Sequence, residues 1–158
     1  MFRIRTRFFP ELNLINLAVD KARKAEVTLT TSQTEEAEQF LRRRLDWRLE
    51  VPEIAEAALS GVGTSEFAAN VFLPVLVFDD QAAEGAPIVV FAATYALLDQ
   101  YSDRVRLEQG VLQAIANENV FNLFDLSERN KVLVWRDADD IFLAVTRQDA
   151  AELRDRIQ

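Results

Sequence analysis

The chain has 158 residues, 49% of them hydrophobic, and contains neither cysteine nor histidine. These absences exclude thiol and imidazole catalysis, disulfides and the usual zinc sites, and leave carboxylate, amine, hydroxyl and backbone chemistry. The formal net charge is −8. A negative balance disfavours nucleic acid as a partner, because neutralisation of phosphates supplies most non-specific affinity.

Composition predicts one soluble globular domain over residues 1–158. The length suffices for a hydrophobic core, and the eleven phenylalanines add large apolar area to it. The longest uncharged apolar stretch, residues 86–98, is shorter than the roughly 20 residues that span a bilayer, so no membrane association is expected. The N-terminal segment lacks the continuous apolar run of a signal peptide, and we expect a cytoplasmic location.

The N-terminal third predicts two strands separated by a helix. Residues 2–8 alternate apolar and charged side chains, which indicates a half-buried strand with a wet, cationic face. A helix is expected over residues 10–24, since a proline suits its first turn and apolar residues then recur at helical spacing. Residues 27–30 are rich in β-branched side chains and predict a short strand.

The next segment predicts three helices. Residues 32–35 match a capping box, and apolar residues then recur four positions apart up to Leu49, which indicates one long helix. A proline permits a break and a second helix over residues 52–59, with Gly61 as its C-terminal cap. A third, short helix is expected between residue 64 and Pro74.

The middle of the chain predicts the centre of a sheet. Residues 75–78 and 88–91 are too apolar to be half-exposed, so each is expected to be a strand covered on both faces. Residues 94–101 and about 103–117 predict two helices, the second of them with an internal glycine that weakens the prediction.

The clearest predicted unit is a β-hairpin near the end of the chain. Residues 131–135 and 141–145 are apolar and flank a polar, acidic connection. A final helix starts at residues 146–149. Because strands and helices are interspersed, we expect the α+β or α/β class: a mixed sheet with helices packed on it, and a C-terminal hairpin near the sheet edge followed by a helix.

A glycine-containing segment at residues 61–65 resembles a phosphate-binding loop only in part. The Walker pattern requires a glycine ahead of its Gly-Lys-Ser/Thr end and the lysine itself, and Ala58 and Thr64 occupy those positions. Without the lysine no cation reaches the phosphates. We therefore interpret this segment as the end of one helix followed by the cap of the next.

Aspartates at the ends of predicted strands form the candidate metal site. Carboxylates in such places hold Mg²⁺ in many phosphoryl-transfer enzymes, including palm-type nucleotidyl transferases and cyclases. The order of elements around the hairpin resembles the signature hairpin of diguanylate cyclases, but Asp137 and Ala138 stand where that family has two glycines. The alternative is that aspartates simply populate hairpin turns. The candidate ligands are Asp79, Asp80, Asp139 and Asp140.

Arginines form the candidate surface for a partner or an anion. Guanidinium groups pair with phosphate or carboxylate, and a tryptophan beside them offers a stacking surface. The alternative is an ordinary solvated face whose charges form local ion pairs of little net value. The candidate residues are Arg3, Arg5, Arg7, Arg43 and Trp47. The many aromatic side chains are interpreted as core.

Two functional hypotheses follow. We favour a non-enzymatic binding or regulatory protein that acts through a protein partner or as a homodimer, because no catalytic constellation is evident. This hypothesis requires no cofactor. The alternative is a Mg²⁺-dependent enzyme or binder that acts on a nucleotide or phosphate through the strand-end aspartates. It requires that the aspartates of the central strand and of the hairpin lie together around an open cleft.

Overall fold

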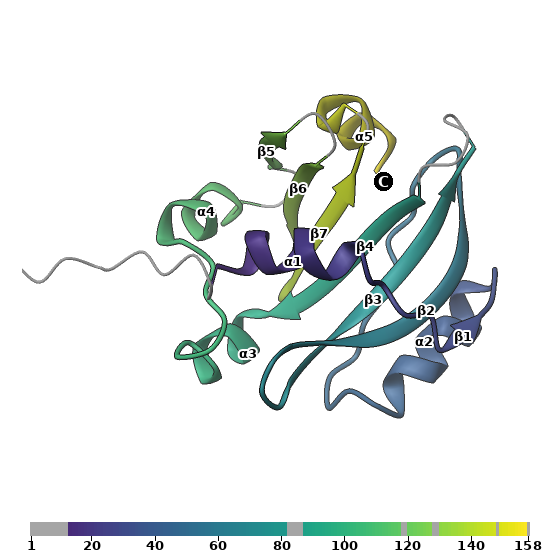
Figure 1. The fold of residues 1–158 in the computed structure, drawn as a ribbon, viewed down its shortest axis with the longest axis horizontal. Coiled ribbons are helices and arrows are strands. Elements are labelled where there is room, and N and C mark those ends of the chain that lie inside the picture. Colours follow the sequence, from purple (N-terminus) through teal and green to yellow (C-terminus); the bar gives the residue numbers. More distant parts are fainter. Residues whose placement is uncertain (1–12, 82–86, 118–119, 128–129, 148, 158) are drawn as a thin grey trace, which may run out of the picture.

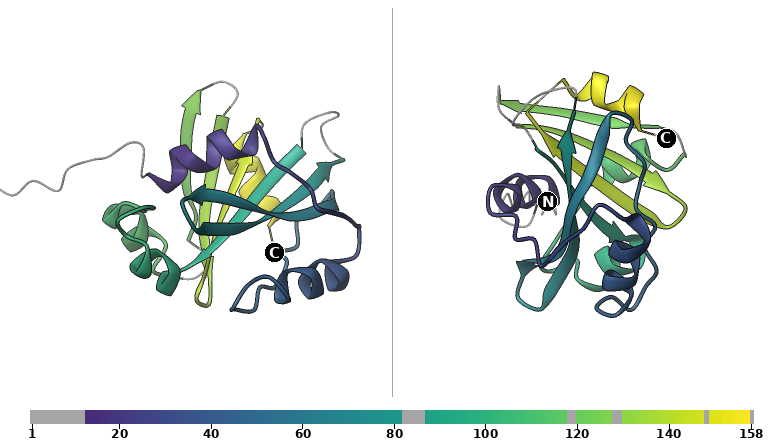
Figure 2. Two further views of the ribbon diagram at one scale, coloured as in Figure 1. Left: turned by 60° about the horizontal axis from the view of Figure 1, so that its bottom comes forward. Right: turned by 90° about the vertical axis from the view of Figure 1, so that its right-hand side faces the viewer.

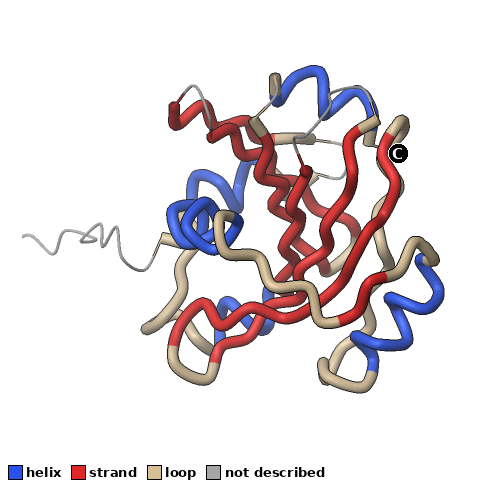
Figure 3. Tube along the Cα trace, turned by 45° about the vertical axis from the view of Figure 1, so that its right-hand side comes forward, coloured by secondary structure: helices blue, strands red, loops and turns tan. Residues whose placement is uncertain are grey.

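The computed structural model describes residues 13–81, 87–117, 120–127, 130–147 and 149–157. The strand expected at residues 2–8, with Arg3, Arg5 and Arg7, lies outside the described residues. The described chain forms one twisted sheet with helices on both faces (Figures 1 and 3). The predicted α+β class is confirmed, including the C-terminal hairpin and the helix that follows it.

The sheet has the strand order β1-β2-β3-β4-β7-β6-β5, and every neighbouring pair of named strands is antiparallel, so the described sheet is antiparallel and not mixed as expected. The strands are β1 Leu29–Thr30, β2 Ala57–Ala68, β3 Val71–Asp80, β4 Pro87–Thr94, β5 Asn122–Ser127, β6 Asn130–Asp137 and β7 Asp140–Thr146. The helices are α1 Leu14–Ala22, α2 Thr34–Arg42, α3 Tyr95–Gln100, α4 Gln109–Ala114 and α5 Ala150–Arg156.

The two faces of the sheet carry separate cores. Helix α1 lies on one side, and α2 and α5 lie on the other (Figure 2, right). We call these the α1 face and the α2 face. Along β3, Leu73 and Val75 pack into the α1 face, whereas Leu76 and Phe78 pack into the α2 face. This alternation within a buried strand confirms that the apolar runs at residues 75–78 and 88–91 are central strands, β3 and β4.

Residues 57–68 form strand β2, so the helices predicted over 52–59 and after residue 64 are wrong. The reason lies at the two glycines, which sit inside β2 where residues 26–28 cross it. A Cβ built on Gly61 would lie 2.4 Å from Val27 Cγ1, and one built on Gly63 would lie 2.4 Å from the Glu26 carbonyl oxygen. The glycines therefore permit a close crossing of two chain segments and do not end helices.

Helix α2 is shorter than predicted. Its N-cap is Gln33, without a side-chain cap, so the capping box is not formed. The chain leaves the helix after Arg42 and folds back along it, and the Val51 backbone N–H donates to Glu38 Oε1 at 3.0 Å. Leu49 is still buried, but in a segment without regular secondary structure, so its spacing from Leu41 does not reflect a continuous helix.

The C-terminal hairpin is confirmed, with a tight turn in which Ala138 has a φ of 53°. The hairpin lies one strand from the edge, because the unpredicted strand β5 pairs outside β6. Helix α5 also matches the prediction, with Asp149 as its N-cap. The helix expected over residues 94–101 forms as α3, with Thr94 as its N-cap, but the helix expected over about 103–117 is reduced to α4.

Candidate functional site

The structure does not bring the four predicted metal ligands together. Strand β4 separates β3 from β7, and its two ends lie beside different aspartates. Asp79 pairs with Pro87 at the start of β4, whereas Asp140 pairs with Thr94 at its end. The pairs Asp79–Asp80 and Asp139–Asp140 are therefore separated by the length of β4, roughly 20 Å at ~3.3 Å per residue. Within the described residues there is no group of three or more acidic side chains placed to hold a metal ion.

Asp80 is engaged in a buried ion pair. Its carboxylate accepts from both terminal nitrogens of Arg156, with Nη2 to Oδ1 at 2.8 Å and Nη1 to Oδ2 at 3.1 Å. The Asp80 side chain is fully buried and that of Arg156 is 9% exposed. The hydrogen bond to Asp80 raises the pKa of Arg156 above its ordinary value, partly opposed by burial. A bidentate pair of this kind satisfies the carboxylate and orients the guanidinium.

The remaining contacts of Arg156 indicate a structural role. Its Nε donates to the Ala55 carbonyl oxygen at 2.8 Å, and Nη2 donates to the Glu56 carbonyl oxygen at 3.1 Å. The Ala55 N–H donates back to the Arg156 carbonyl oxygen at 2.8 Å. One side chain thus fastens the end of α5 to the end of β3 and to the segment that enters β2.

The hairpin aspartates form a repulsive cluster. Asp140 is half-buried, and its burial together with the charges of Asp137, Asp139 and Glu50 raises the pKa of its carboxyl group to about 6. The carboxyl group is therefore protonated more readily in the folded chain than in the unfolded chain. Stability from this group is fully present below the ordinary aspartate pKa and is lost as the pH rises through about 6.

We therefore expect Asp140→Asn to raise the free energy of unfolding at pH 7 by about 1 kcal/mol. The effect is no larger because solvent screens part of the repulsion between these carboxylates. At pH 4 the difference from the wild type should be small, because the native carboxyl is then already neutral. Denaturant unfolding across this pH range measures both values. Asp103→Asn, at an exposed position, is the control and should show no such pH-dependent gain. An equal effect of Asp140→Asn at both pH values would contradict an origin in the charge of this carboxylate.

Of the predicted partner surface, Trp47 lines a cavity and Arg43 does not. The cavity has a volume of about 510 Å³ and lies between residues 44–47, the β2–β3 hairpin and α3, with Phe72 and Tyr101 among its walls. Arg43 is the exposed C-cap residue of α2. Its neighbour Arg44 lines the cavity instead and stacks over the Phe40 ring, with Cζ 3.6 Å from the ring centroid.

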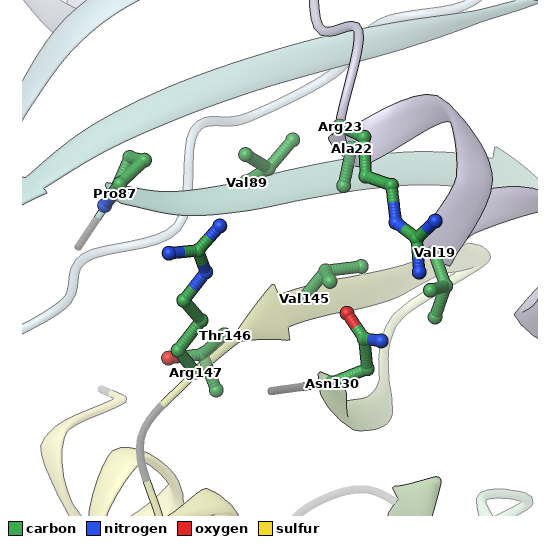
Figure 4. Close-up of a pocket in the computed structure, with 9 residues that line it drawn as sticks. All are labelled: Val19, Ala22, Arg23, Pro87, Val89, Asn130, Val145, Thr146 and Arg147. Carbon is green, nitrogen blue, oxygen red and sulfur yellow. The ribbon is translucent and has the colours of Figure 1, made fainter. Parts of the chain in front are cut away.

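A second cavity, of about 420 Å³, is lined by two arginines that the sequence did not single out (Figure 4). Arg23 is the C-cap residue of α1, and Arg147 follows β7. We call this cavity the Arg23–Arg147 pocket. The two arginines are far apart in the sequence, and only the pairing of β7 with β4 below α1 brings them together. No local motif could have indicated this site. Its other lining residues are Val19, Ala22, Pro87, Val89, Asn130, Val145 and Thr146.

Strand β5 forms an apolar sheet edge. It pairs with β6 on one side, and no described strand pairs with its other side. Leu123 is 37% exposed and Leu126 is 46% exposed, and the preceding Val120 is 38% exposed. On the inner side, Phe121 packs against Trp135 with ring centroids 5.8 Å apart, and Lys131 forms an ion pair with Asp125. The β6 side of β5 is thus fixed by packing and pairing. On its other side, no described strand forms hydrogen bonds with its backbone groups.

None of the helices in the described part of the chain has the length and hydrophobicity needed to cross a lipid bilayer. Comparison of the chain with protein-family models, with curated proteins and with solved structures finds no match.

Proposed function

We propose that this chain is a non-enzymatic binding protein that acts through protein–protein contact, and that its partner at the β5 edge is a second copy of itself. The observation that carries the proposal is the exposed apolar edge of β5. Leu123 and Leu126 are solvent-exposed on a strand whose outer side no described strand covers. Soluble proteins usually protect such an edge with charge, proline or a covering segment, because strands of other chains can pair with an exposed edge.

A second copy supplies the complementary surface. Two β5 strands related by a two-fold axis perpendicular to the sheet pair antiparallel, which makes one continuous sheet across the dimer. The same exposed leucines then meet across the axis, so that apolar area leaves water on both sides. The opposite edge of the sheet, β1, has only two residues and offers little backbone for such pairing.

Two further observations support binding in preference to catalysis. The chain contains neither imidazole nor thiol, and the predicted magnesium ligands fall into two separated pairs. We also propose a cytoplasmic location, because a chain without cysteine does not rely on an oxidising compartment.

The test is the oligomeric state of the full chain and of Leu123→Lys. Light scattering after gel filtration at ~100 µM is expected to give a dimer for the wild type and a monomer for the variant, since like charges placed opposite each other destabilise strand pairing. Phe72→Lys is the matched control, because Phe72 is 49% exposed and lies in β3, outside β5. It should remain dimeric.

A monomeric wild type at this concentration would contradict the homodimer, and so would a dimer that Leu123→Lys leaves intact. Amide hydrogen exchange adds a positive readout. In the dimer, the amides of Asn122–Ser127 should exchange more slowly than in the Leu123→Lys monomer, because the outer backbone groups become hydrogen-bonded.

A further inference from the structure

We propose that the Arg23–Arg147 pocket binds an organic carboxylate with an apolar body, and this proposal does not depend on the β5 dimer. The pocket has a volume of about 420 Å³, within the range of small-molecule sites. It lies between the C-terminal end of α1 and the ends of β4, β6 and β7 on the α1 face.

Among the described residues that line the pocket, the charged side chains all have the same sign. The described residues that line it include two arginines and no acidic side chain. Within the described residues, no carboxylate lies within ion-pair distance of either guanidinium group. The pocket therefore offers a local attraction for an anion.

The two arginines approach the pocket from opposite sides. Figure 4 shows the guanidinium groups of Arg23 and Arg147 flanking Val145, one extending from the end of α1 and the other from the end of β7. Both side chains are exposed at the rim, so they can move toward a bound group. A carboxylate held between them would accept charge-assisted hydrogen bonds from one or both planar guanidinium groups.

The apolar floor of the pocket favours an anion that also has an apolar part. Val89 is 5% exposed and Val145 is 7% exposed, and Val19, Ala22 and Pro87 extend this apolar surface. A small, fully hydrated ion gains nothing from such a surface. A ligand whose charged end meets the arginines while its hydrocarbon part covers the valines gains both electrostatic attraction and apolar burial. A carboxylate with an aliphatic chain has this chemistry.

This chemistry has two sources: a free aliphatic acid, and the C-terminal carboxylate of a polypeptide that ends in an apolar residue. The probes are therefore octanoate with its neutral analogue octanamide, and a tetrapeptide ending in leucine with its C-terminal amide. Calorimetry and thermal unfolding of the full chain at low ionic strength should show binding of octanoate or of the free peptide. Neither neutral analogue should bind at the same concentration. Whichever carboxylate binds more tightly identifies the source.

The variants separate the pocket from general surface charge. Arg23→Gln and Arg147→Gln should each weaken binding about tenfold, since a charge-assisted hydrogen bond is lost. Arg42→Gln makes the same charge change at an exposed position on α2, on the other face of the sheet, and should bind as the wild type does. Ala22→Phe keeps both arginines but fills the pocket, and should abolish binding.

Failure of both carboxylates to bind at millimolar concentration would overturn the proposal. It would also be overturned if the neutral analogues bound equally well, or if Arg42→Gln weakened binding as much as the pocket variants do. Because each variant is checked for its own unfolding temperature without ligand, a loss of folding is distinguished from a loss of binding.

Discussion

Replacing Arg156 by methionine is expected to lower the free energy of unfolding by about 3–5 kcal/mol, the largest effect of any single substitution proposed for this chain. The Asp80 carboxylate would stay fully buried without its cation, and the carbonyl oxygens of Ala55 and Glu56 would each lose a donor. The desolvation of a charge that has lost its partner dominates this cost. Urea unfolding followed by circular dichroism measures it.

Two further variants isolate the cause. Arg154→Met removes an arginine from the same helix. The Arg154 side chain is exposed, and its Nε lies 3.4 Å from Asp155 Oδ1, so its loss should change the free energy of unfolding by less than about 0.5 kcal/mol. Arg156→Met combined with Asp80→Leu removes both charges and should recover most of the loss. A double variant that is less stable than Arg156→Met alone would contradict the account, because the penalty would then not come from the buried carboxylate that has lost its arginine.

Gly63→Ala is expected to destabilise the fold by about 2–3 kcal/mol, although it adds a single methyl group. The new Cβ would lie 2.4 Å from the Glu26 carbonyl oxygen and 3.2 Å from the Thr28 nitrogen, both of which are backbone atoms. Relief requires residues 26–28 to move away from β2. That movement would strain the hydrogen bond from the Thr28 N–H to the Val62 carbonyl oxygen, now 3.0 Å.

Gly110→Ala is the matched control for this prediction. Nothing lies within 4 Å of a Cβ at that position, which is in helix α4. Alanine should therefore stabilise the chain by up to about 1 kcal/mol, since glycine is a poor helix former. Thermal unfolding of both variants gives the comparison. Equal and small effects at the two positions would show that residues 26–28 can move aside at no cost.

The sequence predicted those elements whose pattern is local. The runs that became β3 and β4 are too apolar to be surface, and the hairpin of β6 and β7 has apolar strands around an acidic turn. Strand β2 was not predicted, because residues 57–68 have little β-branched character and contain two glycines that suggest helix ends. Its pairing with β3 and the crossing of residues 26–28 fix its conformation, and neither is visible in a local window.

The buried ion pair and the Arg23–Arg147 pocket depend on contacts between distant residues more than the helices and strands do. Arg156 lies three residues after Leu153 on the inward face of α5, so its position could have indicated a buried partner, but it was not among the predicted site residues. That partner, Asp80, lies 76 residues earlier in the chain, and no spacing rule identifies it. Arg23 and Arg147 likewise come together only through the pairing of β4 with β7. Asp80 was therefore recognised by type, whereas Arg23, Arg147 and Arg156 were not, and the grouping of all four residues needed the topology.

The position of β7 sets an order on how the protein can form during synthesis. Every other strand leaves the ribosome before β7, yet β7 lies between β4 and β6, with Val145 opposite Val89. Until it emerges, the nascent chain holds two separate sets of strands, β1–β4 and β5–β6, each with an open apolar edge. Such edges attract other chains and molecular chaperones. Completion of the sheet is thus a late event. A ribosome that stalls before residue 140 would leave a truncated chain that is prone to aggregation.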